Sequence, residues 1–302
     1  MTLILTRHDV QGLLGFDECI AAVEAAFRLH AEGRSLPPGV LGIRSREGKF
    51  HIKAAGLELG RLYFAAKTNA NFSDNPRRHG LPAIQGVIVL CDGDDGRALA
   101  VMDSIEVTIR RTAAATAVAA RRLARPDAKV VTICGCGNQG RAQLRALTRV
   151  LPLQRAYAFD ADEATARASD VCVTCTPSRQ PFLLRDHVKA GTFVAAVGAD
   201  SPDKQELDPA LVAASVLVVD VLEQCASIGE LHHALDAGVV TRQSVHAELA
   251  DLITGRKPGR RSHEEITIFD STGTALEDVA AAAVVYEKAV ASGAGLTVAL
   301  GN

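Results

Sequence analysis

A glycine-rich turn near the middle of the chain sets the strongest limit on its fold. The turn follows a β-branched run at 129–134, precedes a helical segment that extends to about residue 150, and reads Gly135-Cys136-Gly137-Asn138-Gln139-Gly140. The glycines of a G-x-G-x-x-G turn let the backbone bend sharply and approach a pyrophosphate, whose charge lies at the helix N-terminus. The turn therefore predicts a dinucleotide-binding unit.

Asp160 indicates which dinucleotide is preferred. It ends the next predicted strand, 20 residues after Gly140, where an acidic side chain accepts hydrogen bonds from the ribose hydroxyls. Its carboxylate would repel a 2′-phosphate, so NAD(H) is predicted to be preferred. NADP(H) remains an alternative, because Arg167 could turn in and neutralise that phosphate.

The segment that follows Asp160 is unusually short. Only eight residues separate Asp160 from Ser169, whereas a crossover between parallel strands usually needs a dozen or more. The sequence leaves two explanations open: this unit lacks a helix and a strand, or the sequence omits a disordered segment at this point.

Alternating strand and helix signals indicate the fold class. After Pro126, further strands are predicted at 155–160, 171–174, 193–197 and 216–221. This alternation is typical of a doubly wound parallel sheet of the Rossmann type, and thus of the α/β class. Before it, a helix at 17–30 leads into strands with short turns, which predict a mostly antiparallel sheet in an α+β domain. Those strands are expected at 40–44, 50–55, 62–68, 84–91 and 98–102.

Composition excludes several classes of function. The 302 residues carry a formal net charge of −2 and include no Trp, so neither a nucleic acid nor a membrane is expected as a partner. No apolar stretch reaches the roughly 20 residues of a membrane span, and the N-terminus lacks the pattern of a signal peptide. We therefore expect a cytoplasmic protein. Its seven cysteines are expected to be buried reduced thiols, and no metal site is predicted.

Further motifs are more specific than the glycine turn. They extend over most of the chain and read Arg111-Thr112-Ala113-Ala114, Thr174-Cys175-Thr176-Pro177-Ser178, the stretch 197–207 (VGADSPDKQEL) and Phe269-Asp270-Ser271-Thr272-Gly273. With these motifs the chain resembles the ornithine cyclodeaminase/mu-crystallin family, which includes alanine dehydrogenases and cyclic imine (ketimine) reductases. The resemblance implies a homodimer. It assigns substrate binding and dimerisation to residues 1–112, completed by a C-terminal helix within 275–302, and NAD(P) binding to residues 113–274.

The resemblance also implies roles for individual residues. The positions that hold the substrate carboxylate match Arg44, Lys67 and Arg111, and the proton-transferring acid matches Asp200. Arg suits this task because it can grip a carboxylate with two parallel hydrogen bonds. Besides the turn residues Gly135, Gly137, Asn138, Gln139 and Gly140, the cofactor positions match Thr112, Asp160, Thr176, Val197, Lys204 and Ser271.

The chain departs from the cyclodeaminase pattern at two places. Ala83 replaces a hydroxyl residue, and the stretch 50–53 offers His51 and Lys53 where a cyclodeaminase has an acidic residue for the distal amine of its substrate. We therefore expect a reductase of small cyclic imine carboxylates, such as Δ1-pyrroline-2-carboxylate or Δ1-piperideine-2-carboxylate, which yields proline or pipecolate. The alternatives are an NAD-dependent ornithine cyclodeaminase or alanine dehydrogenase and, in a different class, a non-catalytic binding protein like the mu-crystallins.

Overall fold

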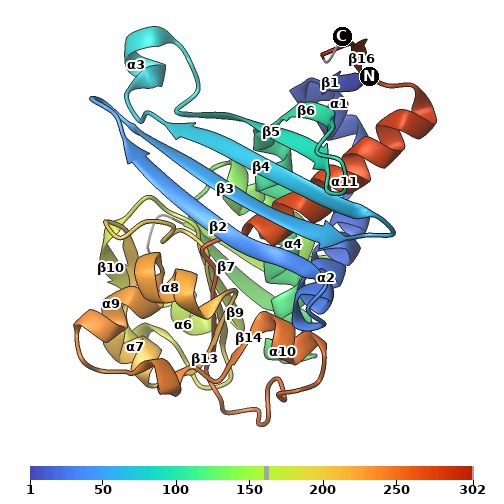
Figure 1. The fold of residues 1–302 in the computed structure, drawn as a ribbon. Helices are drawn as coiled ribbons and strands as arrows, with labels where there is room; N and C mark the ends of the chain where they lie inside the picture. The colour runs from blue at the N-terminus through green and yellow to red at the C-terminus, as the bar shows by residue number, and fades with distance from the viewer. Residues whose placement is uncertain (160–162, 301–302) are drawn as a thin grey trace. The chain divides into compact units, whose positions relative to one another are not determined.

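The computed structural model describes residues 1–159 and 163–300, and the chain divides into two compact units (Figure 1). Unit 1 comprises Met1–Arg111 and Thr274–Asn302, and unit 2 comprises Thr112–Gly273. The separate roles predicted for such domains remain predictions. Asp160 lies outside the described residues. Within those residues, no helix is both long and apolar enough to cross a membrane.

Unit 1 is built on a seven-stranded sheet. Its strands follow the order β16 (Leu296–Val298), β1 (Thr2–Leu5), β6 (Ala98–Asp103), β5 (Ile84–Asp92), β4 (Leu62–Asn71), β3 (Lys49–Glu58) and β2 (Ser35–Arg44). Only the β1–β6 pair is parallel. The predicted, mostly antiparallel sheet is therefore confirmed.

Four helices accompany this sheet: α1 (Arg7–Leu13), α2 (Phe16–Ala31), α3 (Asn75–His79) and α11 (Ala275–Ser292). A capping box begins α1, because the side chains of Thr6 and Asp9 each accept from the other residue's backbone N–H group. Helix α11, red in Figure 1, packs against α2 and against strands β3 and β4. The C-terminal helix is thus part of the core of unit 1.

Strand β2 begins earlier than predicted. It includes Pro37 and Pro38, which we expected to precede the strand, and its register shifts between Leu36 and Gly39. Proline has no N–H to donate, but β2 is an edge strand with one neighbour, so the missing donors leave no partner unpaired. The short edge pair β1 and β16 was not predicted.

Unit 2 contains the predicted parallel sheet. Its strands follow the order β14 (Ala247–Glu248), β13 (Val216–Val219), β15 (Thr267–Asp270), β11 (Phe193–Ala196), β9 (Val171–Thr174), β7 (Val130–Cys134) and β8 (Arg155–Phe159). Every pair is parallel. Strands β9, β11 and β15 are buried along their whole length, as expected of a sheet covered on both faces. The α/β class is confirmed.

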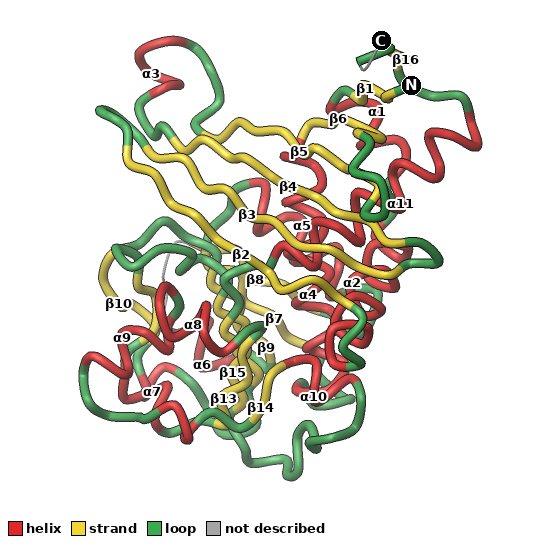
Figure 2. Tube along the Cα trace, viewed as in Figure 1, coloured by secondary structure: helices red, strands yellow, loops and turns green. Residues whose placement is uncertain are grey.

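Helices and a small sheet complete unit 2 (Figure 2). The helices are α4 (Ser104–Leu123, which begins in unit 1), α5 (Asn138–Leu147), α6 (Glu163–Ala168), α7 (Pro209–Ala213), α8 (Leu222–Ile228), α9 (Glu230–Asp236) and α10 (Leu249–Ile253), with 3-10 turns at Arg185–His187 and Arg242–Ser244. The small sheet pairs β10 (Arg179–Leu183) with β12 (Gln205–Leu207).

The short segment after β8 contains a helix but no strand among the residues that the structure describes. Helix α6 occupies Glu163–Ala168, and the chain then enters β9 on the far side of β7. The sheet order therefore reverses at β7, with β8 on one side and β9 on the other. In open α/β sheets, ligands bind outside the carboxyl ends of the strands at such a reversal.

Candidate active site

The glycine turn has a geometry that other residues could not adopt. Gly135 has a φ of +108°, and a Cβ there would lie 2.8 Å from the carbonyl oxygen of Cys175. A Cβ on Gly140 would lie 2.0 Å from the carbonyl oxygen of Gly135. Gly135 is thus required by its backbone conformation, and both glycines are required by close backbone approaches.

Gly137 leaves room for a ligand instead. It is the N-cap of α5, whose first turn receives no side-chain capping bond, and a Cβ on Gly137 would meet nothing within 4 Å. The N–H groups that open a helix attract anions. Asn138 and Cys136 are exposed beside this opening. The prediction of buried cysteines is therefore wrong for Cys136, and Cys91 and Cys175 are only half-buried. The cradle fits a dinucleotide pyrophosphate.

Three predicted cofactor residues lie at the same edge of the parallel sheet. Thr176 follows β9, Val197 follows β11, and Ser271 follows β15, and these three strands are neighbours in register. The Val197 amide donates to the Thr174 carbonyl over 2.9 Å, and the Ser271 amide donates to the Ala196 carbonyl over 2.9 Å. The structure therefore gathers residues that are almost 100 positions apart in the sequence.

The predicted acid Asp200 and the predicted cofactor residue Lys204 form an ion pair. The Lys204 Nζ lies 2.6 Å from the Asp200 Oδ1 and donates to the Gly198 carbonyl over 3.2 Å. The Asp200 side chain is 51% exposed, so it remains accessible to a reacting molecule. Lys204 thus orients the carboxylate that was assigned to proton transfer.

Two of the predicted substrate-binding cations are buried in unit 1, where they bind carboxylates of α11. The Lys67 Nζ lies 2.7 and 2.8 Å from the two oxygens of Asp278, whose Oδ1 also accepts from the Arg111 Nε over 3.0 Å. The Arg111 Nη1 donates to Glu277 over 2.9 Å. Burial alone would raise the pKa of Asp278, but Lys67 and Arg111 together hold it below its usual value. We call Lys53, Lys67, Arg111, Glu277 and Asp278 the buried charge cluster.

Lys53 is a third cation of this cluster. It is 6% exposed and lies directly opposite Lys67 in the β3–β4 ladder, on the same face of the sheet. Burial and the charge of Arg111 lower the pKa of Lys67 to about 7, and Lys53 adds to this effect. Cations so close together resist further positive charge.

Arg44 is not part of the buried charge cluster. It is exposed at the end of β2, and its partner in the β2–β3 ladder is Lys49, whereas Val40 is the residue opposite Lys53. The structure therefore brings together two of the three cations that were predicted to converge.

Sequence reasoning missed the acids Glu277 and Asp278. Glu277 and Asp278 begin a helix, where acidic residues are common because they favour the helix dipole. Glu277 also accepts from the Thr274 amide over 3.2 Å as part of a capping box. The only signal of a buried role was the run of apolar residues that follows them in α11.

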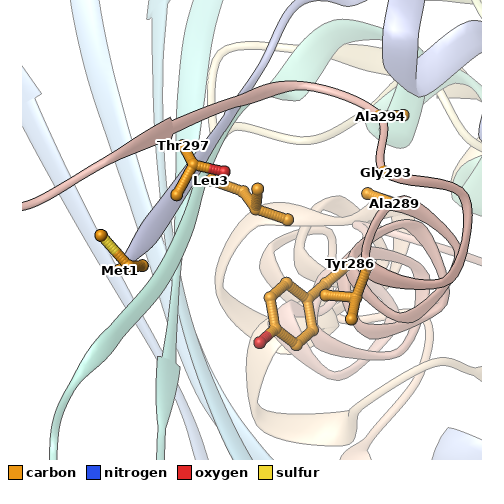
Figure 3. A pocket seen from close by; sticks show the side chains of 8 residues that line it. Met1, Leu3, Tyr286, Ala289, Gly293, Ala294 and Thr297 are labelled. Carbon is orange, nitrogen blue, oxygen red and sulfur yellow. The ribbon is translucent and has the colours of Figure 1, made fainter.

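A separate cavity of about 310 Å³ opens beside Tyr286 in unit 1 (Figure 3). It is lined mainly by small and apolar residues, including Leu3, Ala289 and Gly293. None of the predicted site residues lines it, so we assign it no role in the chemistry.

A dinucleotide cradle at the reversal point of a parallel sheet, with an accessible acid after β11 of the same sheet, is typical of nucleotide-dependent oxidoreductases. The chain belongs to the ornithine cyclodeaminase/mu-crystallin family, whose model matches residues 1–169 and 158–293. The two matched segments overlap after β8, where the crossover is short. The resemblance seen in the sequence is confirmed.

Individual relatives are similar over their whole length. The alanine dehydrogenase of Archaeoglobus fulgidus is 40% identical over 97% of both chains. Two solved structures also match. An archaeal alanine dehydrogenase dimer with bound NAD has a TM-score of 0.94 and 38% identity, with 99% of each chain covered. The Δ1-pyrroline-2-carboxylate reductase of Thermococcus litoralis, in complex with NADH and L-proline, has a TM-score of 0.92 and 30% identity, with 98% of this chain and 100% of that chain covered. The protein is therefore an NAD-dependent oxidoreductase that binds NAD(H).

Proposed function

We propose that this oxidoreductase reduces small cyclic imine carboxylates, such as Δ1-pyrroline-2-carboxylate or Δ1-piperideine-2-carboxylate, to proline or pipecolate. The observation that carries the proposal is the buried charge cluster. It brings Lys67 and Arg111, which the resemblance assigns to the substrate carboxylate, onto the one carboxylate of Asp278, so the two cations converge where a carboxylate binds. The position of Lys53 opposite Lys67 disfavours the second ammonium group of a diamino acid such as ornithine.

Each residue would make a distinct contribution to this reaction. Lys67 and Arg111 would hold the substrate carboxylate, oriented by Asp278 and Glu277. Asp200 would keep the imine nitrogen protonated, which makes the neighbouring carbon electrophilic. When bound, NADH supplies the hydride that this carbon accepts.

Two other substrates define the test. The 40% identical relative named alanine dehydrogenase supports alanine as a second candidate, and a cyclodeaminase would act on ornithine. NADH oxidation should be measured with both imines near neutral pH, beside NAD⁺ reduction with alanine and ammonia release from ornithine without added cofactor. We expect turnover with at least one imine. Turnover with alanine alone, or ammonia release from ornithine, would replace the proposal.

We further propose that NADH is preferred to NADPH, because the Asp160 carboxylate would repel a 2′-phosphate. The ratio of kcat/KM for the two cofactors tests this preference. A preference of about tenfold or more for NADPH, equivalent to ~1.4 kcal/mol, would mean that Asp160 does not face the ribose.

The lowered pKa of Lys67 predicts that kcat/KM for the imine decreases at alkaline pH. A pKa of about 7 means that Lys67 loses its proton as the pH rises through 7, so its hold on a carboxylate weakens. We expect kcat/KM for the imine, which reports the free enzyme, to fall above that pH. In Lys67→Arg this decrease should disappear, because guanidinium stays charged, even if the maximal rate is lower. Titration of the substrate itself affects both proteins equally, so identical profiles would refute the role of Lys67.

We also propose that the protein is a homodimer. The face of the unit 1 sheet opposite Lys67 carries exposed apolar side chains in adjacent ladder rows, including Leu41, Ile43, Phe50 and Val87. Contiguous apolar patches of this kind mark protein interfaces, and a related alanine dehydrogenase is described as a dimer. Sedimentation equilibrium should give twice the 31.8 kDa of one chain; a monomer at micromolar concentration would contradict the proposal.

A further inference from the structure

Glu206 of β12 is a fully buried carboxylate whose two oxygens are both bonded. Its Oε1 accepts from the amide and the hydroxyl of Thr176, over 2.6 and 2.8 Å. Its Oε2 accepts from the hydroxyl of Thr174 over 2.7 Å and from the amide of Gly198 over 2.9 Å. One side chain thus bonds the loop after β9 and the loop after β11.

These two loops carry assigned cofactor and catalytic positions. Thr176 lies in the first loop, and the second contains Gly198 between Val197 and Asp200. The fit around Gly198 is close, because a Cβ there would lie 2.5 Å from the Glu206 carboxylate. Any residue other than glycine would displace the carboxylate from the loop amide.

Two more buried acids hold the backbone around Glu206, one directly and the other through helix α9. Glu230, at the start of α9, accepts from the amides of Glu206 and Leu207 over 2.8 and 3.1 Å. Asp270, at the end of β15, accepts from the amide of Leu231 over 2.9 Å. A hydrogen-bonded series therefore runs from the strand that precedes Ser271 to the loops after β9 and β11.

We infer that Glu206 is a positioning residue that sets the loops binding the nicotinamide end of NAD(H). The inference rests on the proposed roles of Thr176 and Val197 in cofactor binding, and it does not depend on which substrate is reduced. The adenosine and pyrophosphate end is held elsewhere, by the glycine turn after β7. Loss of Glu206 should therefore affect the two ends of the cofactor unequally.

Glu206→Gln is a sharp test because the replacement has nearly the same shape. Each carboxylate oxygen accepts one backbone N–H, from Thr176 on one side and Gly198 on the other. Glutamine has one oxygen and one NH₂ group. Whichever way the amide turns, one loop N–H must face another donor, so one loop loses its anchor.

The measurement compares two probes by calorimetry. NADH spans the whole site, whereas ADP carries only the adenosine and the pyrophosphate. For Glu206→Gln we expect the Kd of NADH to rise about tenfold or more, as for the loss of a hydrogen bond to a charged group, while the Kd of ADP stays within about twofold. Unchanged NADH binding, or an equal loss for both probes, would overturn the inference.

Asp170→Asn is the matched control. Asp170 is also buried, but it precedes β9 at the opposite end of the strand from Thr174, where it accepts from the amides of Lys129 and Val130 over 2.9 and 3.0 Å. This variant should leave the ratio of the two Kd values unchanged, whatever its stability. A selective loss of NADH binding in Asp170→Asn would show that an unequal change in the two Kd values reports general destabilisation, and would refute the inference.

Thr174→Val provides a milder variant if Glu206→Gln does not fold. It removes one hydroxyl donor to Oε2 and keeps both loop amides, so the Kd of NADH should rise about two- to fivefold without a change for ADP. No selective change in this variant would then refute the inference. Because both measurements are of binding, the absence of imine turnover in the wild type would refute the proposed function without affecting this test.

Discussion

Replacing Asp200 by asparagine is expected to lower kcat/KM for imine reduction by about 10²–10⁴-fold, the range that a positioned acid or base contributes. Asparagine retains the size of the side chain and can still accept the 2.6 Å bond from Lys204. It cannot carry a proton to the imine nitrogen, so the carbon would lose its electrophilic character. NADH binding should be unchanged, because the loop keeps its anchor on Glu206.

The neighbouring Asp203→Asn is the control for this experiment. Asp203 is an exposed acid in the same turn, so the variant makes the same chemical change without touching the proposed proton carrier. We expect turnover near that of the wild type. If Asp200→Asn kept more than about a tenth of wild-type activity, the transfer of a proton to the imine nitrogen would have to be assigned to another residue.

The glycine turn could be predicted from the sequence because its determinants are local. A turn with close backbone approaches at Gly135 and Gly140 accepts only glycine, and it must lie between a strand and a helix. The strand before it, β7, is a short, mostly β-branched run that is buried along most of its length. Local constraints of this kind are visible in one sequence without knowledge of the neighbours.

The charged residues of the core could not be predicted in this way. Glu206 lies between Gln205 and Leu207 in a three-residue strand, and nothing in that string distinguishes a buried carboxylate from a solvated one. Its partners Thr176 and Gly198 lie 30 and 8 residues away in the sequence, and their two loops become neighbours only when β9 and β11 pair. Similarly, Arg44 was expected beside Lys67, but the β2–β3 register places it opposite Lys49. Register depends on the whole sheet.

The buried charge cluster makes the largest predicted contribution to stability. Asp278 is 1% exposed and binds both Lys67 and Arg111. In Asp278→Asn, Arg111 keeps its bond to Glu277, whereas Lys67 loses the carboxylate that it binds. Removing one partner from a buried ion pair typically costs about 3–5 kcal/mol, and we expect a loss of about 3 kcal/mol or more in the free energy of unfolding at about pH 6.

The cost should be smaller at alkaline pH, because Lys67 can lose its proton. Its pKa is lowered from 10.5 in the unfolded chain to about 7 in the folded wild type. Between these two pH values the unfolded chain still binds the proton but the folded protein does not, so the free energy of unfolding rises with pH. Asp278 raises the pKa of Lys67, so its loss lowers that pKa further. At pH 6 a larger share of the variant than of the wild type therefore holds a neutral Lys67, whereas at pH 9 Lys67 is neutral in both proteins. Loss of the Lys67 proton therefore begins to stabilise the variant at a lower pH than the wild type, so the penalty of Asp278→Asn is larger at pH 6 than at pH 9.

Urea denaturation of both proteins at the two pH values measures this difference directly. Glu18→Gln is the matched control, because Glu18 pairs with Lys288 at an exposed site in the same unit, with the two side chains 48% and 41% exposed. Loss of such a surface pair costs at most about 1 kcal/mol, and it should cost the same at both pH values because Lys67 is untouched. An Asp278→Asn penalty that is equally small, or that grows towards pH 9, would mean that Lys67 and Arg111 do not depend on this carboxylate.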